Sequence, residues 1–333
     1  MRVGLTFNLK KGQKAGLTAD WDAEWDTEET IDAVKTALST EHKVIPIEAD
    51  ENAVEKLKES RPDIVFNIAE GREGPNREAH IPAMLEMLGI PYTGSDPMSL
   101  SICLDKGRAK EILFFYRVST PRFQVVSSGQ EKIRLKNFPL MVKPLHEGSS
   151  KGVNNDAVVF TVSDLKNKID EITLHYRQPV LVEEYLDGRE FTAALMGNNG
   201  DMRVLPIVEI KFDSLPGDIN PIYSYEAKWI WDRAETPLDI FQCPADVDGR
   251  LKNKIEKITL KAYKSLGCRD WCRIDVRLDS KGNPHILELN PLPGILPRPE
   301  DNSCFPKAAR TAGMSYNEMI LNVLNIARKR YGI

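Results

Sequence analysis

The sequence predicts a mixed α/β protein built from two or three domains. The chain has 333 residues, more than a single hydrophobic core usually organises. Short apolar runs alternate with helix-like segments near its start, and this alternation is typical of a parallel α/β sheet. Near its end, two stretches of alternating apolar and polar residues flank a tight turn, which predicts an antiparallel hairpin.

The first predicted domain covers residues 1–95. Three strands are expected over its apolar runs, at residues 3–7, 44–47 and 64–68. Helices are expected over its helix-like segments, at residues 27–38, 52–59 and 79–88. The run 91–97 contains two prolines and a glycine, so it is interpreted as a turn-rich exit from this domain.

The second predicted domain, residues 96–186, has the mixed pattern of a compact α+β lid. Its helices are expected at residues 106–115 and 163–175, and its strands at residues 123–126, 140–143, 157–161 and 180–184.

The third predicted domain, residues 187–333, contains the hairpin. Strands at 191–196 and 204–211 precede a long loop, residues 212–237, and helices are expected at 247–266 and 316–330. The loop is rich in proline, glycine and aromatic residues, so we expect it to be a lid that is mobile without a ligand.

Composition limits the classes of function. The formal charge is −4 and lysines are interspersed with acidic residues, which argues against a nucleic-acid surface and favours small-molecule partners. No apolar run is long enough to cross a bilayer, and Met1–Phe7 is interpreted as a strand rather than a signal peptide, so a cytoplasmic protein is expected. The five cysteines are expected to be reduced, and the five scattered histidines argue against a zinc hydrolase.

The hairpin carries the most informative polar residues. Side chains alternate along a strand, so Arg273 and Asp275 share one face of the first strand, and Glu288 and Asn290 share one face of the second. If the two faces coincide, two carboxylates and an amide converge on a site suited to Mg²⁺, with a guanidinium beside it. The alternative is a surface hairpin with outward charges, and the hairpin alone does not distinguish the two.

A second candidate site follows the predicted strand 140–143. Lys143 ends this strand, and Gly148, Ser149 and Ser150 follow in a loop whose backbone N–H groups suit phosphate oxygens. In isolation a flexible turn is the better interpretation, because the loop lacks the Walker order of glycine, lysine and serine. Lys106 is either a second phosphate ligand or a solvated charge.

Acidic residues end the predicted strand 180–184. Glu183, Glu184 and Glu190 are placed to bind the amino edge of a purine and the hydroxyls of a ribose. An ordinary polar turn would have the same composition.

In combination, these motifs resemble the ATP-grasp ligases, and nearly the whole chain resembles the D-alanine–D-alanine ligase family. The resemblance rests on the order of the motifs above and on further short sequence segments that match the family, namely 84–95, 142–144, 147–150, 190–192, 266–268 and 308–315. It implies an ATP-grasp fold preceded by a parallel α/β domain, with ATP bound between the central and C-terminal domains. It also implies a homodimer that acts in peptidoglycan synthesis for the cell wall.

The resemblance implies roles for individual residues in binding ATP. The residues that would contact its phosphates are Lys106, Lys143, Ser149, Ser150 and Lys228. Glu183 and Glu184 would lie at the adenine, and Glu190 at the ribose.

The resemblance also implies the metal and catalytic groups. Asp275, Glu288 and Asn290 would hold two Mg²⁺ ions, for which Mn²⁺ can substitute. Arg273 and the Gly294 N–H would stabilise the oxyanion of the reacting carbonyl, while Ser149 and Lys228 would assist at the reacting phosphate.

The chain departs from the family where the amino acids should bind. The segment after the first strand is longer and acidic, so Glu24 or Glu28 is a candidate for binding an ammonium group. Glu70 stands where the family has a histidine, and an anion there prefers a cation. Trp229 replaces a tyrosine and has no hydroxyl to donate.

The segment after Asn290 is about four residues longer than in the family, and Arg298 or Ser303 would bind the second carboxylate. Arg298 is favoured because a guanidinium binds a carboxylate with two hydrogen bonds. The expected activity is therefore ATP-dependent amide formation from a small carboxylate and an amine, most simply two D-alanines. Alternatives are a ligase for other amino acids or a specialised acid, or a nucleotide-binding regulatory protein, against which the intact catalytic residues argue.

Overall fold

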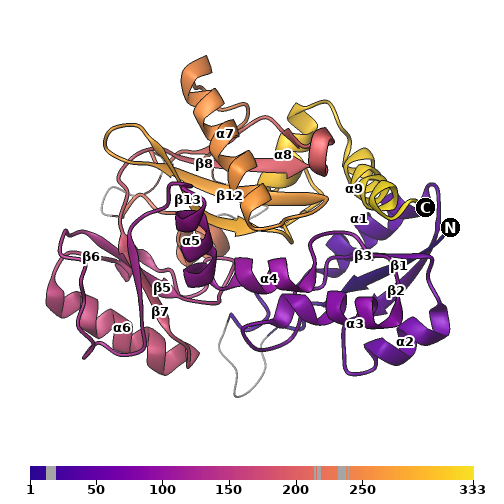
Figure 1. Cartoon of the computed structure of the whole chain (residues 1–333), viewed down its shortest axis with the longest axis horizontal. Coiled ribbons are helices and arrows are strands. Elements are labelled where there is room, and N and C mark those ends of the chain that lie inside the picture. The colour runs from indigo at the N-terminus through magenta and orange to yellow at the C-terminus, as the bar shows by residue number, and fades with distance from the viewer. Residues whose placement is uncertain (13–19, 214, 216–218, 232–237, 239) are drawn as a thin grey trace.

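A computed structural model describes residues 1–12, 20–213, 215, 219–231, 238 and 240–333. It contains three sheets, each covered by helices (Figure 1). The predicted mixed α/β class and the antiparallel hairpin are confirmed. None of the helices in this part of the chain is both long and apolar enough to span a membrane.

The N-terminal sheet is parallel and has the order β2-β1-β3. Its strands are β1 (Arg2–Phe7), β2 (Lys43–Glu48) and β3 (Ile64–Asn67). The connecting helices are α1 (Glu28–Ser39), α2 (Ala53–Ser60) and α3 (His80–Leu88). The α1 helix begins where the Thr27 side chain accepts a hydrogen bond from the Thr30 N–H, which satisfies one of the free donors of the first turn.

The central sheet is antiparallel, with the order β4-β7-β5-β6. Its strands are β4 (Phe123–Val126), β5 (Leu140–Pro144), β6 (Val158–Val159) and β7 (Val180–Glu184). The helix α6 (Val162–Tyr176) buries Leu165, Ile169 and Ile172 in the same core as β5 and β7. The strand predicted at 157–161 is shorter than expected, because only two of its residues pair with β5.

The C-terminal sheet has the order β11-β10-β8-β12-β13, with β9 paired to β8. Its strands are β8 (Glu190–Met196), β9 (Arg203–Val204), β10 (Val208–Ile210), β11 (Phe241–Gln242), β12 (Trp271–Leu278) and β13 (Pro284–Asn290). The helix α7 (Gly249–Ser265) covers it. The single strand predicted at 204–211 is divided into two short strands, β9 and β10, which pair with opposite ends of β8 along the edge that β12 leaves free.

Two helices were not expected. α4 (Pro97–Leu104) begins inside the segment interpreted as a turn, because the Asp96 side chain caps it and Pro97 takes the first helical position, where no N–H is needed. It leads into α5 (Lys106–Phe115). The other helix is α8 (Cys304–Thr311), which follows the extended segment after Asn290.

Both ends of the chain contribute to one hydrophobic core. Val323 and Leu324 of the last helix, α9 (Tyr316–Tyr331), belong to the same buried cluster as Val34 and Leu38 of α1. Figure 1 shows these two helices side by side, next to the N-terminal sheet. Trp271 of β12 lies in this cluster as well, so the N-terminal and C-terminal sheets are packed together.

Candidate active site

Two adjoining cavities lie where the three sheets meet. The larger has a volume of about 260 Å³ and the smaller about 100 Å³. The residues that line both include the four predicted catalytic groups, Ser149, Lys228, Arg273 and Gly294, together with the predicted phosphate ligand Lys106 and metal ligand Glu288. These groups therefore form the wall between a larger and a smaller compartment.

The hairpin brings its four polar residues to one place. Asp275 of β12 pairs directly with Glu288 of β13, and Arg273 pairs with Asn290. The Asp275 carboxylate accepts hydrogen bonds from Arg273 Nε at 3.1 Å and Nη2 at 3.0 Å, and from Asn290 Nδ2 at 3.2 Å. The two polar faces thus coincide, as the metal-site interpretation of the hairpin requires.

Glu288 is held as a carboxylate. Burial alone would raise its pKa, but Lys106, Lys143 and Arg273 more than offset burial and lower it to about 2. An ionised carboxylate is the form that binds a metal ion.

The donor set fits Mg²⁺, which prefers oxygen ligands and completes its octahedron with water and phosphate. It consists of two carboxylates and one amide, Asp275, Glu288 and Asn290. No cluster of three or more His, Cys, Asp or Glu side chains suited to a metal occurs among the described residues.

A buried triad positions Lys143. Its Nζ lies 2.6 Å from Glu183 Oε1, and Lys110 Nζ lies 2.8 Å from the other oxygen, Oε2. Burial opposes the charge on Lys143, but Glu183 and Glu288 outweigh it and raise its pKa. Glu183, expected at the adenine, is thus the counter-ion of two lysines. Glu184 lies at the end of β7, and its carboxylate is 3.8 Å from Arg122 Nε.

Two further lysines line both cavities. Lys106 donates to the carbonyl of Glu147, and its Nζ lies 3.7 Å from Glu288 Oε2. Lys228 lies in the short π-helix Ala227–Trp231. Burial, with Arg273 nearby, lowers the pKa of Lys228 to about 8. The ammonium form of Lys228 is therefore less stable than that of an exposed lysine, and a bound anion would stabilise it.

The larger cavity also has the features of a nucleoside pocket. Glu190 lines it, and Arg277 Nη1 donates to Glu190 Oε2 at 2.8 Å. Its apolar wall is made of Met141, Ile210, Ile222, Phe241 and Leu287. A planar base fits such a wall, and a carboxylate at one end suits ribose hydroxyls.

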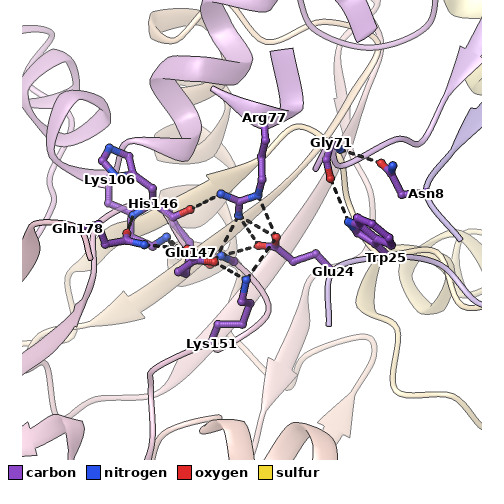
Figure 2. Close-up of polar contacts among 12 residues, drawn as sticks. Asn8, Glu24, Trp25, Gly71, Arg77, Lys106, His146, Glu147, Lys151 and Gln178 are labelled. Atoms are coloured by element: carbon purple, nitrogen blue, oxygen red, sulfur yellow. Dashed lines mark hydrogen bonds and ion pairs between the residues drawn. The ribbon is translucent and has the colours of Figure 1, made fainter. Parts of the chain in front are cut away.

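The glycine-serine loop is tied to the N-terminal domain by Glu24. Ser149 and Ser150 have φ values of 51° and 59°, so the loop makes a tight turn. Gly148 N–H donates to Glu24 Oε1 at 2.7 Å, and a Cβ at Gly148 would lie 2.6 Å from that oxygen. Glu24 also accepts from Arg77 Nε at 3.1 Å and from Nη2 at 2.7 and 2.8 Å (Figure 2).

The structure separates the candidates for binding amino acids. Glu24, Glu70 and Ser303 line the cavities. Ser303 Oγ donates to the Gly294 carbonyl at 2.9 Å and accepts from Leu296 N–H at 3.2 Å.

Two candidates lie away from the cavities. Arg298, the favoured carboxylate ligand, forms a half-exposed ion pair with Glu29, and Glu28 is exposed in the first turn of α1. The expectation for Arg298 rested on its chemistry alone, and the extended segment carries it to the surface instead. The side chain of Trp229 lies outside the described part of the chain, as do residues 214, 216–218 and 232–237 of the predicted lid.

Part of the predicted lid is described and lies against the glycine-serine loop. Ser150 Oγ donates to the Tyr223 carbonyl at 2.9 Å, and Tyr225 N–H donates to the Val153 carbonyl at 2.8 Å. The loop and this segment therefore close over the larger cavity together.

Comparisons with known proteins agree with the fold and the motifs. A family model described as the D-ala D-ala ligase C-terminus matches residues 117–325. A D-alanine–D-alanine ligase of Mannheimia succiniciproducens is 34% identical over 304 residues, covering 89% of this chain and 91% of that protein. The chain belongs to the D-alanine–D-alanine ligase family. This result confirms the resemblance drawn from the motifs.

Two further comparisons show how far the likeness extends. The uncharacterized protein y4sG of Sinorhizobium fredii is 36% identical over 298 residues, which cover 87% of this chain and 84% of that protein. The crystal structure of the Bacillus anthracis D-alanine–D-alanine ligase complexed with ATP superposes with a TM-score of 0.75, covering 100% of this chain and 99% of that one. Its sequence identity is 23%, so it establishes the fold.

Several residues of the site in this family member were missed from the sequence. They are Asp26, Arg77, Glu78, Lys110 and Lys151, all buried or half-buried around the cavities or their supporting ion pairs. The Arg77 pair with Glu24 spans 53 residues of sequence, and no local spacing signals such a contact. Glu78 follows Arg77 in the single turn Arg77–Ala79.

Glu78 predicts a pH-dependent stability change. Burial, together with Glu24 and Glu288, outweighs the attraction of Arg77 and Lys106 and raises the pKa of Glu78 from 4.5 to about 7. Since the folded state binds this proton more tightly, ionisation of Glu78 destabilises the fold as pH rises from about 4.5 to 7. Glu78→Gln should therefore increase the free energy of unfolding by about 1–3 kcal/mol at pH 8 and leave it nearly unchanged at pH 4.

Denaturant unfolding at the two pH values measures this effect. Glu73→Gln is the matched control, because Glu73 is exposed in the same segment, and it should change neither value. Equal stabilisation by Glu78→Gln at pH 4 and pH 8 would contradict the electrostatic explanation.

Proposed function

We propose that the chain is an ATP- and Mg²⁺-dependent carboxylate–amine ligase. It would transfer the γ-phosphoryl group of ATP to a substrate carboxylate, and an amine would then displace phosphate to form an amide. The observation that carries this proposal is the register of the hairpin, which sets Asp275 opposite Glu288 and Arg273 opposite Asn290 at the wall shared by the two cavities. The ATP-bound relative of the same fold supports the choice of nucleotide.

The chain's own groups fit the steps of such a reaction. The phosphates would be bound by Lys106, Lys143 and Lys228, and the loop with Ser149 and Ser150 would close over them. Ser149 and Lys228 would assist at the reacting phosphate. Glu190 would bind the ribose, with Glu184 at the adenine end of the pocket.

A metal ion held by Asp275, Glu288 and Asn290 would offset charge on the reacting phosphate. Mn²⁺ should replace Mg²⁺, because the donors are all oxygens.

Arg273 is suited to the second step. It lines both cavities, and a tetrahedral oxyanion forms on the carbonyl when the amine attacks. Gly294 lies at the same wall, and its N–H would be a second donor to that oxyanion. Ser303 would bind the second substrate from the larger cavity.

The substrates of the named relatives suggest the first reaction to test, which is the joining of two D-alanines in cell-wall synthesis. The test is phosphate release with ATP, Mg²⁺ and a panel of D- and L-amino acids. Amino-acid-dependent release is expected, and its absence with every member of the panel would favour a regulatory nucleotide-binding protein. The homodimer stays a prediction.

Lys143 provides a test of the nucleotide site. Lys143→Ala should weaken ATP binding by about tenfold to a hundredfold, since a charge-assisted contact with phosphate is lost. Calorimetry with a non-hydrolysable ATP analogue measures it. Lys168→Ala is the control, because Lys168 of α6 is also largely buried but pairs with Asp156 and Glu171 and lines neither cavity. Unchanged affinity in Lys143→Ala would remove Lys143 from the site.

A further inference from the structure

The smaller cavity is lined by more carboxylates than cations among the described residues. Its acidic lining residues are Glu24, Asp26, Glu70, Glu78 and Glu288. The rest of its wall combines the cations Lys106, Lys228 and Arg273 of the shared wall with apolar residues, namely Ile68, Leu104, Trp271, Leu292 and Ile295. Unpaired carboxylates are costly in such surroundings, so a cation from outside the chain would stabilise them.

Two of these carboxylates are already engaged. Glu24 accepts hydrogen bonds from Arg77 and from Gly148 N–H, as described above. Lys151 Nζ also lies 4.0 Å from Glu24 Oε2. Glu288 faces Lys106 and belongs to the candidate metal site. Glu24, considered above as the ammonium ligand, is therefore not free to bind one.

A third carboxylate, Asp26, has Lys10 as a cationic neighbour that attracts it. Glu70 and Glu78 remain. Neither forms a hydrogen bond or an ion pair with any residue in the described part of the chain. Arg77 attracts both, but its guanidinium donates to Glu24 and to the carbonyl of His146 at 2.9 Å (Figure 2).

The backbone segments that carry the two carboxylates are held close together. Gly71 N–H donates to Asn8 Oδ1 at 2.8 Å, and the Gly71 carbonyl accepts from Trp25 Nε1 at 3.0 Å (Figure 2). Gly71 has φ +81°, and a Cβ there would lie 2.1 Å from the Arg77 carbonyl oxygen. This close approach holds the segment that carries Glu70 against the turn that carries Glu78.

We propose that the smaller cavity binds an amino acid with a second, side-chain amine, whose two ammonium groups are bound by Glu70 and Glu78. One α-ammonium would offset only one of the two carboxylates. A second positive charge offsets the other, and the substrate carboxylate then points to Arg273 and Gly294 at the wall shared with the nucleotide cavity.

The size of the cavity favours a short side chain. Its volume of about 100 Å³ is smaller than that of an engineered cavity of about 150 Å³ that binds benzene. The side chain of 2,3-diaminopropionate or 2,4-diaminobutyrate suits this space better than that of lysine or arginine. This inference rests on the proposed ligase activity and specifies its substrate class.

The kinetic test compares diamino acids with neutral amino acids of similar size. The diamino acids are 2,3-diaminopropionate, 2,4-diaminobutyrate, ornithine and lysine, and the neutral ones are alanine, 2-aminobutyrate and norvaline, each as both enantiomers. We expect kcat/KM for a short diamino acid to exceed that of its neutral counterpart by about tenfold to a hundredfold, the effect of one charge-assisted contact. Glu70→Gln and Glu78→Gln should remove this preference, and Glu73→Gln should keep it.

A binding measurement tests the inference separately from turnover. The full chain, loaded with a non-hydrolysable ATP analogue and Mg²⁺, should bind the short diamino acid more tightly than 2-aminobutyrate by the same factor. Calorimetry measures the two affinities. Phosphate release with neutral amino acids at equal or higher kcat/KM would overturn the inference and leave the ligase proposal standing. Diamino-acid binding lost in Glu70→Gln and Glu78→Gln, but without any phosphate release, would support the inference and overturn the ligase proposal.

Discussion

Glu288→Ala is expected to reduce the turnover number by at least about 1,000-fold, which corresponds to about 4 kcal/mol of lost transition-state stabilisation. Glu288 lies opposite Asp275 in the hairpin, and three cations keep it ionised. Removing it leaves one carboxylate and one amide, too few to hold two divalent ions. Steady-state phosphate release at saturating ATP and substrate measures the effect.

The fold should survive this change, because Glu288 is partly accessible from the cavities and adds little packing. Circular dichroism and thermal unfolding of Glu288→Ala should match the wild type closely. In the described part of the chain the exposed Glu111 pairs with the neighbouring Arg108, so Glu111→Ala is the control and should retain full turnover. Normal turnover in Glu288→Ala would show that the metal site has been placed wrongly.

Arg273→Lys is the second change with a large expected effect. A lysine keeps the positive charge, but it lacks the planar fork that now donates two hydrogen bonds to Asp275 and would reach the oxyanion. We expect kcat to fall by about 100- to 1,000-fold, the usual cost of removing one oxyanion donor. The KM for ATP should change little.

This division between kcat and KM separates a catalytic role from a structural one. Arg269→Lys is the matched control, since Arg269 precedes the same strand and pairs with Asp96 away from the shared wall. Equal losses in kcat and in ATP affinity for Arg273→Lys would point to a displaced Asp275 instead. An unchanged kcat would exclude Arg273 from the reacting centre.

The parts of the site that were predicted well depend on local periodicity. The faces of β12 and β13 follow from a repeat of two residues, and the register then brings Asp275 and Glu288 together. The glycine-serine loop was found because it directly follows an apolar strand. Such signals lie within one strand, one hairpin or one strand and the loop that follows it, where the backbone itself limits the geometry.

The parts that were missed depend on contacts between distant segments. In the sequence, Lys110 is one lysine among others in a helix and belongs to no motif. It is almost fully buried, and Glu183, 73 residues further along the chain, lies beside it as its counter-ion. Arg77 and Glu24 meet in the same way. Conversely, Arg298 had the right chemistry for a carboxylate ligand, but the path of its segment leaves it at the surface, while Ser303 lies at the cavity.

The packing of α9 against α1 has a consequence for the order in which the protein is made. The sheet β2-β1-β3 is synthesised first, but the cluster that covers α1 includes Val323 and Leu324 near the end of the chain. On the ribosome, Val34 and Leu38 therefore lack these neighbours until α9 has emerged. The N-terminal sheet and its helices therefore cannot complete their core without α9, and a chain that lacks α9 would leave the apolar face of α1 exposed.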